Sequence, residues 1–230
     1  MNELFKDSIF FGVFISILSY IIGTLLKKRF KSAIFNPLLI AIVLTTLVLI
    51  ILKIDYSTYY NSAKYISFLL TPATVCLAVP LYEQLALLKK NLVAVTIGIT
   101  TGVLTSLSSV LLLSYLFSLD HNSYVTLLPK SITTSIGIGI SDELGGYISL
   151  TVAVIIITGI VGNITAEGVL KLFKITDPIA KGVAIGTASH ALGTTKAMEI
   201  GEVEGAMSSL SIVVSGILTV IAAPLFANLF

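Results

Sequence analysis

Long stretches without a charged residue, separated by short polar or basic connections, dominate this chain. They are Ser8–Leu26, Asn36–Leu52, Tyr65–Tyr82, Asn91–Leu119, Leu144–Ala166 and Gly205–Phe230. An α-helix crosses the hydrocarbon core of a bilayer with roughly 20 apolar residues, and several of these stretches approach or exceed that length. Charged residues make up only 11% of the 230 residues, whereas soluble domains contain about 25%. We therefore expect an all-α polytopic membrane protein.

The basic residues predict the orientation of the chain. Four of them follow the first apolar stretch, between Lys27 and Lys31. The positive-inside rule places this loop in the cytoplasm and the N-terminus outside. A signal peptide has the reverse order, with its charge before the apolar core. We therefore expect Ser8–Leu26 to be a membrane helix of a multi-pass protein.

The segment Leu127–Ser141 decides the number of spans. It is short, rich in hydroxyl groups, and contains Lys130. If it enters and leaves on one side, Lys171 and Lys174 stay cytoplasmic and the chain has about seven spans. If it crosses, those lysines face outward and the chain has about eight spans. The positive-inside rule favours the re-entrant form.

Several helix-breaking residues lie inside these apolar or weakly polar segments. They are Pro72, Pro80, Pro129, Gly186 and Gly193. Backbone groups that are freed by a break cannot face lipid, so they must line a cavity or be buried in protein. Broken helices of this kind are typical of transporters, where they form the substrate site. The breaks therefore predict a polar cavity within the membrane.

A weak internal likeness predicts a repeat. The segments that begin at Leu69 and Leu127 open in a similar way, and each leads to an acidic residue. Under the re-entrant topology the triplets of segments around them run antiparallel, as in inverted-repeat transporters. We expect a single transmembrane domain over 1–230, with repeat halves 1–120 and 121–230.

Two lysines in apolar surroundings are the first candidates for function. A lysine at bilayer depth costs roughly 3 kcal/mol on insertion scales, so Lys130 and Lys196 need a reason to be there. One interpretation is that they attract an anionic substrate, with hydroxyl groups completing a carboxylate site. In the other, each ammonium group reaches the membrane interface, or Glu199 pairs with Lys196. The candidate substrate-binding residues are Lys130, Ser131, Thr133, Thr134, Thr71, Thr74, Ser189, His190, Thr194 and Lys196.

Other polar residues in the second half of the chain have two interpretations each. His190 either carries a coupled proton, since the pKa of imidazole is near physiological pH, or is a hydrogen-bonded packing residue. Glu202, the second proton-coupling candidate, either pairs with Lys196 or Lys130 and senses the empty site, or lies in a solvated turn. Asn163 either joins two helices or lines the site.

No spacing indicates a catalytic triad, paired catalytic carboxylates or a cluster of metal ligands. We therefore expect no enzyme activity, no metal and no cofactor. The net charge is +2, and we expect no nucleic-acid partner.

Four motifs carry a resemblance to a known family. They are Asn36–Ile40, Thr71–Tyr82, Leu128–Thr134 and Gly186–Ser209. On these residues the chain resembles the LrgB/CidB family of bacterial membrane proteins, also called antiholin-like proteins, over nearly its whole length. One departure is Ser135, where a proline often follows the Thr-Thr pair in the family.

The resemblance implies two functions. One is transport of small monocarboxylates such as pyruvate or glycolate, as in a related plastid glycolate/glycerate translocator, together with a small LrgA/CidA-type membrane partner. The other is regulation of murein hydrolase activity and cell lysis. The family is similar to the sodium–proton antiporter and bile-acid symporter folds, and we expect a homo-oligomer. A cationic, hydroxyl-rich site agrees with transport, because a pure holin would need only oligomerising amphipathic helices.

Overall fold

The computed structural model describes residues 8, 10–30, 35–69, 72, 75–76 and 78–230. Within these residues every regular element is an α-helix, which confirms the all-α class. The chain divides into two compact units, Met1–Cys76 and Leu77–Phe230. Among the described residues, four helices are long and apolar enough to cross a membrane, and they are α2 (Phe11–Phe30), α8 (Leu92–Leu116), α11 (Ile148–Leu172) and α13 (Glu202–Ala227).

The first unit contains α2, α3 (Pro37–Leu52) and α4 (Tyr56–Ser67). The Asn36 side chain caps α3 by accepting hydrogen bonds from the backbone N–H groups of Leu38 and Leu39, at 2.9 and 3.3 Å. Proline is favoured in the first turn of a helix, where its missing N–H costs nothing. The pair Asn36-Pro37 therefore marks the start of α3.

The third apolar stretch has different helix boundaries from those expected. The segment that contains Tyr56 and Tyr60 is already helical, and α4 ends at Ser67. The two rings stack with centroids 5.8 Å apart, an i,i+4 contact that helical geometry permits. Pro72 is exposed, whereas Thr71 and Thr74 lie outside the described residues.

Two short helices open the second unit. They are α6 (Ala78–Glu83), which contains Pro80, and α7 (Leu85–Lys90). The long helix α8 follows, and Gly98 and Gly102 give it a face of small residues. A Cβ atom at Gly98 would lie 3.2 Å from Val183, and one at Gly102 would lie 2.6 Å from the Thr187 methyl group. These glycines let α8 approach α12 (Pro178–Ile200) closely.

A helical hairpin follows α8. It consists of α9 (His121–Leu127), a non-helical tip at residues 128–133, and α10 (Thr134–Glu143). After the tip the chain returns toward α9, because the Tyr147 N–H donates a hydrogen bond of 2.8 Å to the hydroxyl of Thr126. Thr151 also donates to the Thr126 carbonyl, at 3.2 Å. We call this element the first hairpin.

The helix α12 forms a second hairpin. Its backbone leaves helical geometry at His190, where φ is 42° and ψ is −140°. The chain then folds back, since a Cβ atom at Gly193 would lie 3.0 Å from the side chain of Ile185, eight residues earlier. Ile185 and Ala197 of the two arms share one small apolar cluster. We call this element the second hairpin.

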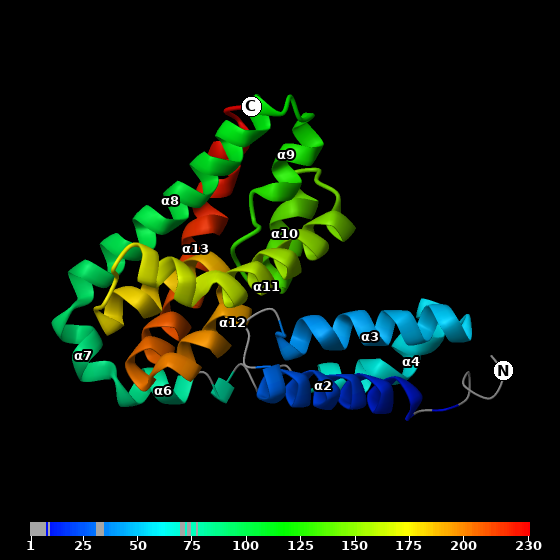
Figure 1. Cartoon of the computed structure of the whole chain (residues 1–230). Helices are drawn as coiled ribbons and strands as arrows, with labels where there is room; N and C mark the ends of the chain where they lie inside the picture. Colours follow the sequence, from blue (N-terminus) through cyan, green and yellow to red (C-terminus); the bar gives the residue numbers. More distant parts are fainter. Residues whose placement is uncertain (1–7, 9, 31–34, 70–71, 73–74, 77) are drawn as a thin grey trace. The chain divides into compact units, whose positions relative to one another are not determined.

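The two hairpins are attached at opposite ends of the second unit. The C-terminal ends of α8 and α13 lie together, because the Tyr115 hydroxyl donates to the carbonyl of Leu229 at 3.0 Å, and the first hairpin begins there (Figure 1). The second hairpin begins at the other end, where Lys181 pairs with Glu204 in the first turn of α13, at 3.6 Å. The tips of both hairpins therefore point into the unit.

The helix α11 extends further than the predicted segment. It continues past Ala166 to Leu172, so Glu167 and Lys171 lie in its last turns rather than after it. Their side chains are 3.5 Å apart at i,i+4 spacing, which supports the additional turn.

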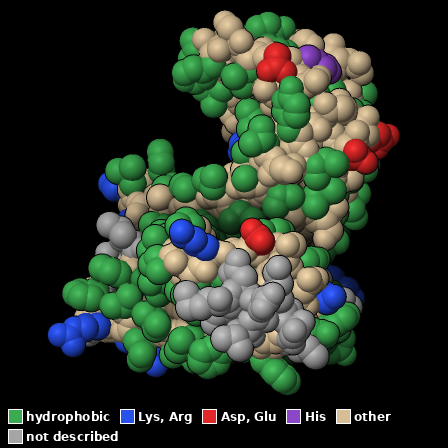
Figure 2. Space-filling model, turned by 90° about the vertical axis from the view of Figure 1, so that its right-hand side faces the viewer, with side chains coloured by type: hydrophobic (Ala, Val, Ile, Leu, Met, Phe, Trp, Pro, Cys, Tyr) green, Lys and Arg blue, Asp and Glu red, His purple; other side chains and the backbone are tan. Residues whose placement is uncertain are grey.

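Large apolar side chains cover much of the outer surface. Leu112, Ile157 and Ile221 are 69%, 58% and 62% exposed, and they come from three of the long helices. Figure 2 shows hydrophobic side chains over most of the visible face, with charged side chains in a few separate places. Soluble monomers rarely expose apolar surface to this extent. Contact with lipid accounts for it, as a membrane protein requires.

Candidate functional site

A cavity of about 820 Å³ opens within the second unit, along α8, the first arm of the second hairpin and the tip of the first hairpin. Its polar lining consists of hydroxyl groups, one lysine, Asn91 and the carboxylate residue Asp177. We call this cavity the hydroxyl groove, and its hydroxyl and lysine residues are Thr101, Thr105, Ser106, Ser109, Lys130, Ser131 and Thr187.

Lys130 is the charged centre of the hydroxyl groove. Its ammonium group donates hydrogen bonds to the hydroxyls of Ser106, at 3.2 Å, and Ser131, at 3.1 Å. None of the ion pairs found in the described part of the chain involves Lys130. Ser106 lies near the middle of α8, so this ammonium is far from both ends of a helix long enough to span a bilayer. A cation here without a carboxylate partner favours the binding of an anion.

The hydroxyl groups of α8 are the part of the groove that the sequence analysis missed. Thr101, Thr105 and Ser109 recur every four residues, and this spacing places them on one face of a helix. Ser106 lies beside that face and bonds to the Ser131 hydroxyl at 3.1 Å. This periodicity is the sequence signal that indicates a polar face on α8.

The other candidates of the first hairpin lie around its tip. Pro129 is within the non-helical tip, and Ser131 lines the groove. Thr133 is the extended N-cap residue of α10, and Thr134 is the first residue of that helix. Neither threonine belongs to the groove lining.

His190 lies at the turn of the second hairpin and is buried. Its Nε2 atom is 3.0 Å from the carbonyl oxygen of Ile155. Because a carbonyl can only accept, Nε2 donates and carries the proton. The ring also packs against Gly159, where a Cβ atom would lie 2.7 Å from the imidazole Cε1 atom. These contacts match the packing interpretation of His190, and its proton-coupling role stays a prediction.

The residues on either side of His190 hold the turn in place. Thr194 donates to the carbonyl of His190 at 3.0 Å and shares a hydrogen bond of 2.7 Å with the hydroxyl of Ser208. Ser189 packs against Gly162 of α11. The turn lies between Gly186 and Gly193, which are both helical, so the two glycines serve close packing at these positions.

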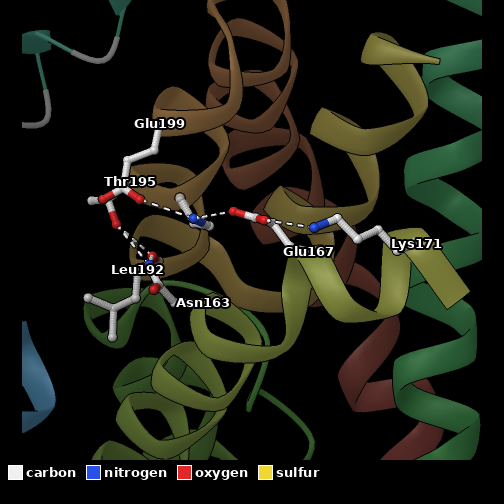
Figure 3. A network of polar contacts seen from close by, with 7 residues as sticks. Asn163, Glu167, Lys171, Leu192, Thr195 and Glu199 are labelled. Carbon is white, nitrogen blue, oxygen red and sulfur yellow. Dashed lines mark hydrogen bonds and ion pairs between the residues drawn. The ribbon is translucent and has the colours of Figure 1, made fainter. Parts of the chain in front are cut away.

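Lys196 is part of an ion-pair network in the second arm of the second hairpin. Its ammonium lies 2.5 Å from the carboxylate of Glu167 and 3.2 Å from that of Glu199. Figure 3 shows the Glu167 carboxylate between this ammonium and that of Lys171. The pairing with Glu199 confirms one of the two interpretations of Lys196. The network separates Lys196 from the groove, whose lining does not include it.

Asn163 joins two helices, as one interpretation predicted. Its side-chain amide donates to the carbonyl of Leu192 at 2.7 Å and to the hydroxyl of Thr195 at 3.1 Å (Figure 3). It thereby holds the second arm of the second hairpin against α11.

Glu202 is exposed at the start of α13. The carboxylate partners of Lys196 are Glu167 and Glu199, so the structure agrees with the solvated-turn interpretation of Glu202 rather than with its pairing to Lys196. Glu167 lies on α11 and is distant in sequence from Lys196 on α12, so no short sequence pattern indicates that the two side chains pair. Among the described residues, no group of three or more His, Cys, Asp or Glu side chains could hold a metal ion.

The pair formed by Lys196 and Glu167 is expected to contribute to stability. A double-mutant cycle with Lys196→Met and Glu167→Gln should give a coupling energy of about 0.5–1 kcal/mol, since both groups are partly exposed. Thermal unfolding of the purified protein measures it. The pair Lys171–Glu167, more exposed and 3.5 Å apart, is the matched control and should give about 0.3 kcal/mol. Equal coupling in both pairs would contradict the expectation.

Comparison with known proteins identifies the family. Residues 16–229 match the model of the LrgB-like family. Antiholin-like protein LrgB of Bacillus cereus (strain B4264) is 38% identical over 218 residues, which cover 94% of this chain and 95% of that protein. Antiholin-like protein LrgB of Bacillus anthracis (strain A0248) is similar to the same extent. No solved structure matches the chain significantly. The chain therefore belongs to the LrgB-like family.

Proposed function

We propose that this protein is a secondary transporter, or a transporter subunit, for small monocarboxylates such as pyruvate or glycolate. One observation carries the proposal. Lys130, a cation that forms no ion pair within the described residues, lies in the hydroxyl groove at a depth near the middle of α8. Hydrogen bonds from a charged donor to a carboxylate are about twice as strong as neutral ones. The groove thus has the chemistry for a small anion.

The size and lining of the groove agree with this role. Ligand pockets commonly have volumes of about 300–1,000 Å³, and the groove has about 820 Å³. A two- or three-carbon acid would share such a volume with water. The hydroxyl groups of Ser106 and Ser131 accept from Lys130 and share one hydrogen bond, which leaves one of their two protons to donate to the same carboxylate.

The arrangement of the hairpins supports alternating access. The two hairpins are attached at opposite ends of the second unit, and we propose that α8 with the first hairpin and α11 with the second hairpin form an inverted repeat. We propose about seven spans, with the first hairpin re-entrant, in a bacterial plasma membrane and with the N-terminus outside. A small LrgA/CidA-type protein and further copies of this chain are the proposed partners.

Uptake into proteoliposomes tests the proposal. Labelled pyruvate or glycolate should accumulate in vesicles that contain this protein, alone or with the small partner, several-fold above empty vesicles. Entrapped carboxyfluorescein, a larger and unrelated anion, should stay inside. Absence of carboxylate uptake both with and without the partner would overturn the proposal.

A second candidate is an antiholin-like regulator of murein hydrolase activity and cell lysis. The names of the similar Bacillus proteins favour it, and they support this function at least as well as transport. A regulator that acts through a pore predicts leakage of carboxyfluorescein. It also predicts little sensitivity of that leakage to substitutions of His190 or Lys196.

A further inference from the structure

A second, much smaller cavity lies behind the hydroxyl groove. It has about 10 Å³, which is close to the space that one water-sized group needs. Three residues line both cavities, namely Ser106, Ser131 and Thr187. Two further hydroxyl residues, Ser215 and Thr219 of α13, line the inner cavity. Together the two cavities form a hydroxyl-lined recess beside Lys130.

Thr187 is a residue of this recess whose buried hydroxyl lacks a partner among the described residues. Its side chain is only 4% exposed, and Oγ1 forms no hydrogen bond with any described residue. Within the described part of the chain, Ser114 also has a fully buried hydroxyl without a partner, and it lines neither cavity. A buried hydroxyl without a partner is unfavourable, so such a group needs an explanation.

The hydroxyl of Thr187 is unpaired, whereas comparable hydroxyls in the same unit form hydrogen bonds. Threonine and serine in helices usually donate to the carbonyl four residues earlier. Thr194, Ser209 and Ser211 do so in this unit, whereas Thr187 does not. Its methyl group packs against Gly102, which fixes the side chain between α12 and α8. The Thr187 hydroxyl is therefore fixed in position without a hydrogen-bond partner, in the wall that the two cavities share.

We propose that Thr187 is a specificity-determining residue of the hydroxyl groove. Its hydroxyl binds the second oxygen of the bound anion, a carbonyl or hydroxyl oxygen on the carbon next to the carboxylate. Lys130, with Ser106 and Ser131, holds the carboxylate itself. This inference rests on the proposed function, because it assigns a role within the same site. A ligand without the second oxygen leaves the buried hydroxyl unpaired, which is an effective means of discrimination.

Binding to the purified full-length chain in detergent tests the inference. The probes are pyruvate and propionate, which have the same number of carbons and differ in the second oxygen. Thr187→Val removes the hydroxyl and keeps the side-chain shape, and it should weaken pyruvate binding about tenfold, while the affinity for propionate stays unchanged. Thr187→Ser keeps the hydroxyl and should retain the preference of the wild type for pyruvate. Calorimetric titration measures the affinity of each protein for each probe.

Thr165→Val is the matched control, because Thr165 is an exposed residue of α11 outside both cavities. It should leave both affinities unchanged. If Thr187→Val does not fold, Thr187→Ala makes the same comparison.

Wild-type protein that binds neither probe would overturn the proposed function together with this inference. Wild-type protein that binds pyruvate, with equal binding by the hydroxyl-free variant, would overturn the inference alone. Equal weakening for both probes would also overturn it, since Thr187 would then act only on the shape of the groove.

Discussion

Replacement of Lys130 with methionine is expected to reduce carboxylate uptake by at least about tenfold. Methionine has a similar length and no charge, so the change removes the ammonium and its hydrogen bonds to Ser106 and Ser131. A hydrogen bond that involves a charged group contributes about 1.5–3 kcal/mol, which corresponds to a factor of roughly 10–150 in affinity. Initial rates of labelled pyruvate or glycolate uptake into proteoliposomes measure the effect.

Two further variants make this result specific to the groove. Lys130→Arg keeps the positive charge and should retain part of the uptake, although the planar guanidinium cannot reproduce the geometry of an ammonium. Lys196→Met removes a lysine that already has two carboxylate partners. It should lower the unfolding temperature but leave uptake within about twofold of the wild type, in line with a modest ion pair. Wild-type uptake by Lys130→Met would remove the anion-site assignment.

The local features of this fold could be predicted from short sequence patterns. Asn36-Pro37 and Asp177-Pro178 mark helix starts, and in both cases the acceptor side chain caps the first turn. The predicted interruption around Pro129 lies within the non-helical tip of the first hairpin. Such features depend on a few neighbouring residues, and for that reason the sequence alone identifies them.

The tertiary partners could not be predicted in the same way. Lys196 and Glu167 lie on different helices, and only the fold-back at His190 brings the second arm of the second hairpin to α11. No helix-breaking proline marks that turn, and the flanking Gly186 and Gly193 are helical. The groove likewise depends on the contact between α8 and α12, since Thr187 reaches it only through the packing of its methyl group on Gly102.

The close contact of the second hairpin with α13 leads to the second large effect. Gly186→Ala is expected to destabilise the protein by about 2 kcal/mol, because overpacking of a tight contact typically costs 1–3 kcal/mol. A Cβ atom at Gly186 would meet the carbonyl oxygen of Ser208, and it would lie 2.8 Å from the Cα atom of that residue. These are backbone atoms, so rotation of a side chain cannot relieve the overlap. The unfolding temperature of the purified protein should fall by roughly 4–8 °C.

Gly168→Ala is the matched control for this prediction, because it makes the same change in a long helix where no atom lies within 4 Å of the added Cβ. Alanine is the better helix former by roughly 1 kcal/mol, so this variant should unfold at the same or a higher temperature. Gly182→Ala, whose Cβ would lie 2.5 Å from the carbonyl oxygen of Glu204, should behave like Gly186→Ala. If all three variants unfold at the wild-type temperature, the first arm of the second hairpin does not pack on α13 through these glycines. The hydroxyl groove would then lose the support of one wall, because Thr187 lies next to Gly186 on the same arm.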